Sequence, residues 1–133
     1  MRIPKRIWQT WKTHQVPAHW RASPESIQKY CPDWDYTLMD DQDNLNFVQK
    51  YFPEYLELYE SFDREIYRAD IIRYLLLYKY GGVYMYLDIK LIRPLEELFD
   101  GEGELYLVNT PNWSGYTNAF MASVPKCKFW LNC

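Results

Sequence analysis

The sequence predicts an α/β domain with a mainly parallel sheet and flanking helices. Two patterns predict this fold class. Short segments of alternating apolar residues are separated by segments in which apolar residues recur every three or four positions. Proline and glycine residues lie between these segments, without repeats or low-complexity linkers. The length of 133 residues fits one domain, expected to span 1–133. In such layered domains, ligands bind beyond the carboxyl ends of the strands.

The local patterns place the elements in order along the chain. The longest helix is expected to end at Gly81, where a left-handed residue commonly follows a helix. The other elements are predicted from N-cap residues, from prolines that end helices, and from the alternation of apolar and polar residues in strands. The expected elements are a strand over 2–10, a helix with Ser23 as N-cap that stops before Pro32, a strand over 34–39, a helix opened by Asp40 and ended by Pro53, a helical piece over 55–59, a helix over 63–80, a strand over 83–89, a short helix over 95–99, and strands over 104–109 and 118–124.

Composition and charge exclude several classes of protein. The net charge of −3 and the pI of about 5.4 argue against a nucleic-acid binder, which needs a basic surface. Three cysteines at no metal-ligand spacing argue against a disulfide framework or a zinc site. No apolar run approaches the roughly 18 residues of a membrane span, and no apolar segment follows the basic N-terminus as in a signal peptide. The sequence therefore predicts a soluble chain and does not indicate its compartment. His14 and His19 are expected to be solvated loop residues.

The segment YGGVYMYLDIK at 80–90 holds the strongest chemical signal. Because strand side chains alternate between faces, Tyr84, Tyr86 and Asp88 are expected to share one face, opposite an apolar one. On the preceding helix, Asp70 and Arg73 are three residues apart and share a face. The glycine turn would bring these groups together around one solvent-open hollow. Carboxylates and a guanidinium suit phosphates, sugar hydroxyls or a hard cation.

Simpler interpretations remain open on the pattern alone. Asp70 and Arg73 could be a surface ion pair, and Asp88 only a charge at a strand end. Tyrosines at strand spacing are often core residues, as are tryptophans such as Trp8 and Trp11. The surplus of aromatic residues, 19% of the chain, also suits a concave site that stacks ring-shaped ligands.

Three stretches together resemble DXD-type sugar transferases: IPKRIWQTWK at 3–12, RADIIRYLLLYKYGGVYMYLDIKLIRPLEELF at 68–99 and NAFMAS at 118–123. This family includes yeast-type initiating α-1,6-mannosyltransferases, capsular polysaccharide sugar transferases and clostridial glucosylating toxins. The resemblance implies a GT-A fold, which is the Rossmann-like fold of nucleotide-diphospho-sugar transferases. It also implies a UDP- or GDP-sugar donor, Mn²⁺ or Mg²⁺, a glycan or protein acceptor, and usually retention of the anomeric configuration. Relatives usually continue well beyond the third stretch, so the domain is expected to be C-terminally short.

The resemblance also implies roles for individual residues. Trp11 matches the aromatic residue that stacks on the donor base, and Asp70 and Arg73 match the acid and arginine at the donor sugar and phosphates. Tyr84 and Asp88 match the residues that meet the diphosphate and metal. Asp88 and Arg73 are the expected catalytic residues, and Asp88 the expected metal ligand.

Tyr86 stands where the family carries the first aspartate of its motif. A phenol is a poor neutral ligand for a hard cation, so metal affinity is expected to fall. The function that the family resemblance implies is hexosyl transfer from a nucleotide sugar. The alternative is a degenerate transferase domain that serves as a nucleotide-sugar-binding or scaffold module.

Overall fold

The computed structural model describes residues 1–61, 65–99, 101–109 and 116–132, with the side chains of 65–70, 109, 116–118 and 131–132 outside the description. Five strands form one mixed sheet in the order β2-β1-β3-β5-β4. The first three of these pair in parallel, and the last two are antiparallel. The sheet is thus parallel over one half only, whereas the sequence predicted a mainly parallel one. The strands are β1 (Arg6–Thr10), β2 (Asp35–Met39), β3 (Gly82–Met85), β4 (Leu105–Asn109) and β5 (Tyr116–Ser123).

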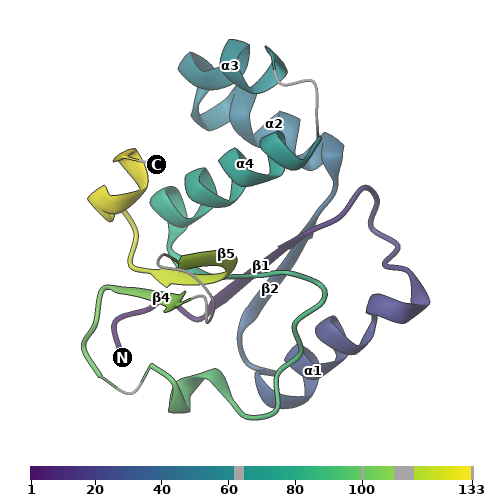
Figure 1. The fold of residues 1–133 in the computed structure, drawn as a ribbon, viewed down its shortest axis with the longest axis vertical. Coiled ribbons are helices and arrows are strands. Elements are labelled where there is room, and N and C mark those ends of the chain that lie inside the picture. Colours follow the sequence, from purple (N-terminus) through teal and green to yellow (C-terminus); the bar gives the residue numbers. More distant parts are fainter. Residues whose placement is uncertain (62–64, 100, 110–115, 133) are drawn as a thin grey trace.

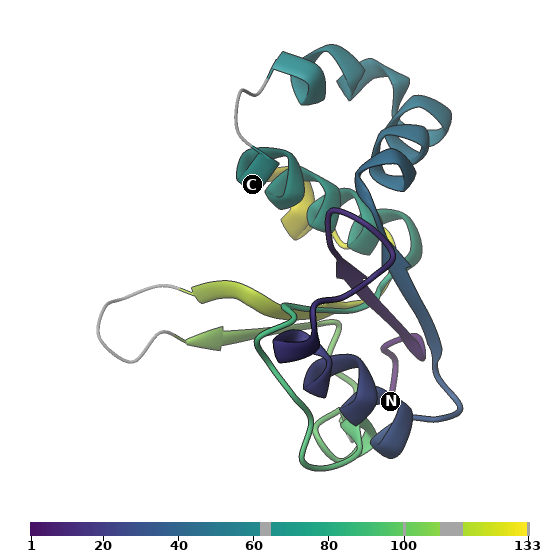
Figure 2. The same ribbon diagram turned by 90° about the vertical axis from the view of Figure 1, so that its right-hand side faces the viewer.

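Helices cover both faces of the sheet. Figure 1 and Figure 2 both show α2, α3 and α4 stacked over one face, while α1 lies on the other. Among the described residues, no helix is both long and apolar enough to cross a lipid bilayer. The helices are α1 (Ala22–Tyr30), α2 (Asp41–Tyr51), α3 (Leu56–Ser61) and α4 (Glu65–Tyr80), with 3₁₀ turns η1 (Ala18–Trp20), η2 (Pro53–Tyr55), η3 (Leu95–Glu97) and η4 (Lys128–Asn132).

Several element boundaries differ from the sequence prediction, and three of these differences concern residues near the candidate site. β1 begins at Arg6 rather than at residue 2, because Arg6 N–H bonds back to the Pro4 carbonyl instead of to a strand. Ser23 is not the N-cap of α1, since Arg21 takes that position and Ser23 lies buried inside the helix. The predicted strand over 83–89 ends at Met85. The start of the predicted helix at 63 lies outside the described residues.

The sheet separates two apolar clusters, which follow the alternation of its strands. Val83 and Met85 pack into the cluster that includes Ile27 of α1. Tyr84 packs into the other cluster with Leu76 and Leu77 of α4. The predicted alternation is therefore confirmed for Val83, Tyr84 and Met85, and α4 lies on the side to which Tyr84 points.

A tight glycine turn joins α4 to β3. Gly81 has a φ of 70° and Gly82 a φ of 103°, so both adopt left-handed conformations that other residues rarely take. The predicted left-handed residue after the helix is confirmed at Gly81. A Cβ atom on Gly82 would lie 2.5 Å from the Arg6 carbonyl oxygen of β1. The turn thus brings the start of β3 directly against β1.

Candidate active site

The carboxyl ends of β1, β2 and β3 meet at one edge of the sheet. The connection after β1 leads through α1 to β2 on one side, while β3 lies on the other side of β1. Strands whose connections leave in opposite directions form a crevice beyond their carboxyl ends, which is where doubly wound sheets bind ligands. The crevice predicted by this topology lies between the residues that follow Thr10 and those that follow Met85.

A buried arginine lies beneath this edge. Arg73 of α4 is 2% exposed, and its Nη1 donates to the Tyr86 hydroxyl at 2.6 Å. Its guanidinium carbon lies 4.9 Å from the centre of the Tyr84 ring and 4.7 Å from that of Tyr86. The two rings meet edge to face at 6.1 Å. The aromatic faces and the phenol stabilise a charge that would be costly to bury alone.

Hydrogen bonds tie this cluster to β1. The hydroxyls of Tyr84 and Thr10 are 2.7 Å apart and share a hydrogen bond. Gln9, which is fully buried, donates to the Ser23 hydroxyl at 2.7 Å and to the Tyr86 carbonyl at 3.5 Å. Its side-chain oxygen accepts from Tyr36 at 2.8 Å. Burial raises the pKa of the Tyr36 hydroxyl to about 12, so it keeps its proton at neutral pH.

Asp88 lies in a turn rather than on a strand face. Tyr86 N–H still donates to the Ala119 carbonyl of β5 at 2.8 Å, but its own carbonyl accepts from Ile89 N–H at 3.2 Å, which closes a turn over 86–89. Asp88 is exposed in that turn. The structure therefore brings Arg73, Tyr84 and Tyr86 together, while Asp88 extends into solvent a turn away.

The other predicted site residues do not all lie at the open edge of the sheet. Trp11 follows β1 at the same edge, is partly exposed, and donates its backbone N–H to the Met39 carbonyl at 3.1 Å. The side chain of Asp70 lies outside the described residues. Arg73 and Tyr84 are both 2% exposed, so they do not line an open hollow. Tyr86 is the partly exposed member of the cluster.

The residues around position 86 fit a divalent cation poorly. The Tyr86 oxygen accepts a hydrogen bond from a guanidinium, so a metal bound to it would lie close to a permanent positive charge. Among the described side chains, the cluster with suitable metal-ligand spacing does not include Asp88.

The cluster consists of His14, Asp40 and Asp43, and the sequence analysis does not predict it. His14 Nε2 bonds to Asp43 Oδ2 at 2.5 Å, and its Nδ1 lies 3.4 Å from Asp40 Oδ2. Asp40 and Asp43 also cap α2 reciprocally. His14 is exposed in its loop, as expected, and it also contacts two carboxylates, which the sequence does not predict. A parallel β1-α1-β2 unit places the loop after β1 beside the start of α2, and no sequence spacing shows that proximity.

The hydrogen bond with Asp43 raises the pKa of His14. For Asp43, burial acts to raise the pKa, but hydrogen bonds from the Asp40 backbone and from His14 outweigh it and lower the pKa. A protonated His14 thus pairs with both carboxylates, and these contacts account for the arrangement of the cluster.

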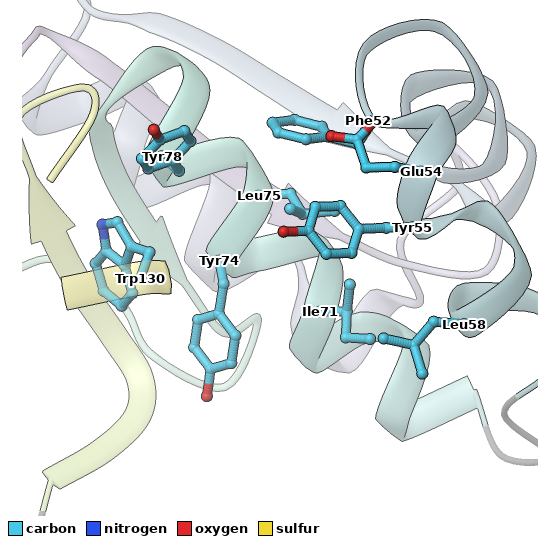
Figure 3. A pocket seen from close by; sticks show the side chains of 9 residues that line it. All are labelled: Phe52, Glu54, Tyr55, Leu58, Ile71, Tyr74, Leu75, Tyr78 and Trp130. Atoms are coloured by element: carbon cyan, nitrogen blue, oxygen red, sulfur yellow. The ribbon is translucent and has the colours of Figure 1, made fainter. Parts of the chain in front are cut away.

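A separate pocket of about 310 Å³ lies on the far side of α4 (Figure 3). One wall is the outer face of α4, and the opposite wall comes from η2 and α3. Trp130 of η4 lies near Tyr74, with their rings stacked 5.6 Å apart. None of the predicted site residues with a described side chain lines this pocket, whose lining is Phe52, Glu54, Tyr55, Leu58, Ile71, Tyr74, Leu75, Tyr78 and Trp130.

Comparison with known proteins places the chain in a family. A family model described as "Glycosyltransferase sugar-binding region containing DXD motif" matches residues 17–104. The chain belongs to this glycosyltransferase family. A solved structure named PaToxG Glycosyltransferase shares the fold with a TM-score of 0.73 over 97% of this chain and 58% of that one, at 16% identity. The predicted GT-A fold is confirmed.

The curated relatives that the chain matches include mannosyltransferases of two yeasts. Inositol phosphoceramide mannosyltransferase 3 of Schizosaccharomyces pombe is 42% identical over 72% of this chain and 27% of its own length. Mannosyl phosphorylinositol ceramide synthase SUR1 of Saccharomyces cerevisiae is 36% identical over 97% and 33%. The initiation-specific alpha-1,6-mannosyltransferase of the same yeast is 32% identical over 71% and 21%. The chain thus spans about a third or less of these relatives.

Proposed function

We propose that this chain binds a UDP- or GDP-sugar and transfers its hexose, a mannosyl residue, to an acceptor. Residues 1–133 would form the donor-binding part of the transferase. The observation that carries the proposal is the family match over 17–104, because that range contains the cluster of Arg73, Tyr84 and Tyr86 near the carboxyl end of β3. The mannosyl residue is inferred from the names of the relatives.

The acceptor is proposed from the same relatives. Two of them are named for inositol phosphoceramide or mannosyl phosphorylinositol ceramide, and a third for α-1,6-mannosyl transfer. The candidate acceptors are therefore a phosphoinositol lipid and a glycan or protein.

In the proposed reaction, the bond between the anomeric carbon and a phosphate oxygen breaks, and negative charge grows on the leaving diphosphate. A fixed positive charge near that group lowers the barrier because it needs no reorganisation. Arg73 would supply this charge from beneath Tyr86, since its guanidinium is buried and donates to that hydroxyl. It would thus act as a positioning residue behind Tyr86 rather than by direct contact.

The remaining roles carry over by position. Trp11 would stack on the donor base, Asp70 and Tyr84 would support the donor sugar and phosphates, and Asp88 would accept hydrogen bonds from donor hydroxyls. Asp88 is also the carboxylate left for Mn²⁺ or Mg²⁺, with low affinity because Tyr86 replaces its partner; no step of the transfer is assigned to the metal. We expect retention of the anomeric configuration.

Thermal unfolding in the presence of nucleotide sugars tests the proposal. Ligand at 100 times its Kd should stabilise the protein by about 2.7 kcal/mol. We expect a rise in Tm with GDP-mannose or a UDP-sugar, and release of the nucleoside diphosphate when inositol phosphoceramide or a mannan acceptor is added. A rise in Tm with a nucleotide sugar, but no release of nucleoside diphosphate with any of the acceptors, would favour the alternative of a degenerate binding module. No stabilisation by any nucleotide sugar would contradict both functions.

A further inference from the structure

We propose that the pocket beside α4 is a second ligand site, which binds a ring of a neutral saccharide away from the carboxyl edge of the sheet. The pocket has a volume of about 310 Å³, at the small end of the range for small-molecule sites. It therefore suits one or two sugar rings rather than a long chain. The inference goes beyond the proposed function, because binding here requires neither a nucleotide nor the residues of that edge.

One wall of the pocket exists because α4 is apolar on two sides. Its inward residues, such as Leu76 and Leu77, are fully buried in the cluster beneath the helix. A helix that is apolar all round usually has packing partners on both sides, but the outer face of α4 stays partly exposed. This face therefore leaves apolar surface for a ligand to cover. Its residues in the pocket recur at helical spacing and are Ile71, Tyr74, Leu75 and Tyr78.

Aromatic rings make up much of the remaining lining. The Trp130 ring stacks on that of Tyr74, with 5.6 Å between the centres and 18° between the planes, and Tyr55 lies on the opposite wall (Figure 3). Trp130 is held in place because its indole N–H donates to the Ser123 hydroxyl at 2.8 Å. A pyranose ring presents C–H groups that pack on the negative face of an aromatic ring. The pocket is thus a concave site of the kind that the surplus of aromatic residues predicts.

Two opposite charges beside the pocket favour a neutral ligand. The Glu54 carboxylate is part of the lining, which disfavours a phosphate or an anionic lipid headgroup. The Lys126 ammonium lies 4.9 Å from the centre of the Tyr78 ring, which disfavours a cation of the kind that aromatic groups otherwise attract. Sugar hydroxyls are uncharged and both donate and accept hydrogen bonds, so they suit a carboxylate and an ammonium alike.

The polar groups of the lining are available to such a ligand. In the part of the chain that the structure describes, the Glu54 carboxylate and the hydroxyls of Tyr55 and Tyr78 take part in no hydrogen bond or ion pair. Lys126 is fixed beside Tyr78, because its backbone N–H donates to the Tyr78 carbonyl at 2.6 Å. A hydrocarbon chain would remove water from these groups without replacing its hydrogen bonds, which costs free energy. A saccharide replaces them.

Titration of the unmodified protein with α-1,6-linked mannotriose, without nucleotide, tests this proposal. The probe is chosen from the name of one relative, and the tryptophan indole N–H signals are followed by NMR. We expect a saturable shift of the Trp130 signal with a Kd of about 1 mM or tighter. No shift of that signal at about 10 mM mannotriose, or a shift with choline or hexyl phosphate in its place, would overturn the inference. A shift of the Trp11 signal alone would also overturn it and leave the proposed function standing.

Two variants of the lining locate the site. Tyr55→Ala removes one aromatic wall, and Glu54→Gln removes a charged acceptor while it keeps the shape of the side chain. Each should weaken mannotriose binding about fivefold or more. Tyr51→Ala is the matched control, because Tyr51 and Tyr55 are both 38% exposed and Tyr51 lies outside the lining; its affinity should equal that of the unmodified protein. Unchanged affinity of Tyr55→Ala at matched Tm, or an equal loss in Tyr51→Ala, would refute the proposal.

Discussion

His14 connects the loop after β1 to the first turn of α2 through its contacts with Asp40 and Asp43. Because the hydrogen bond with Asp43 raises the pKa of His14 above its ordinary value of 6.5, the protonated form is favoured in the folded state. The resulting stabilisation is fully present below pH 6.5 and is lost as the pH rises through the folded-state pKa. Asp43, whose pKa is lowered, sets the acid limit, since its contribution disappears as the pH falls through its own folded-state pKa.

The Tm of His14→Gln, measured from pH 5 to 9 beside the unmodified protein, checks this prediction. The variant should melt at a lower temperature at pH 5, and the difference should vanish towards pH 9. His19→Gln is the matched control, because His19 packs against the Trp20 ring at 4.7 Å and should show no such trend. A difference in Tm that is constant over the whole range would exclude the ion pairs as its cause.

At the residue scale, the sequence predicts on which face of a strand or helix a side chain lies, but it does not predict whether that side chain is buried. Tyr84 and Tyr86 were placed on one face with Arg73 nearby, and the structure brings these three together. Their burial could not be predicted, because it depends on how closely α4 packs on the sheet. The contacts of His14 were missed for a related reason: they join segments 26 to 29 residues apart, which only the parallel strand topology brings together.

At the scale of elements, the turn between α4 and β3 determines where Arg73 lies relative to Tyr84. Gly82→Ala would place a Cβ atom 2.5 Å from the Arg6 carbonyl oxygen at a φ of 103°. The backbone strain alone costs about 1–3 kcal/mol, so we expect a clear fall in the free energy of unfolding. Denaturant titration measures this. Gly101→Ala is the control, because the nearest atom to its Cβ would be the Tyr106 hydroxyl at 3.9 Å. Equal stability of the two variants would contradict this account of the turn.

Most elements were predictable because their signals are local. The caps at Asp40 and Gly81 and the alternation around Val83 each depend on a few neighbouring residues, and all appear in the structure. The end of β3 was not predictable, because residues 86–89 keep the strand alternation while their backbone closes a turn. The mixed character of the sheet also depends on contacts between distant segments, namely the antiparallel pairing of β3 with β5.

At the scale of the whole molecule, the described residues include two candidate places for a ligand. One is the parallel edge, where Trp11 and Tyr86 follow β1 and β3. The other is the aromatic pocket between α4 and α3, which Trp130 helps to line. The family match and the carboxyl-edge rule for α/β sheets both favour the first for the nucleotide.

The indole N–H signals of ¹⁵N-labelled tryptophan, followed by NMR during titration with GDP and UDP, distinguish the two places most directly. Trp34 immediately precedes β2, at its amino end, and Trp130 lines the aromatic pocket, so both indoles report on sites away from the carboxyl edge. Single Trp→Phe variants assign the signals. The account predicts that the Trp11 signal shifts with nucleotide while those of Trp34 and Trp130 stay in place. A shift of the Trp130 signal with Trp11 unmoved would contradict it.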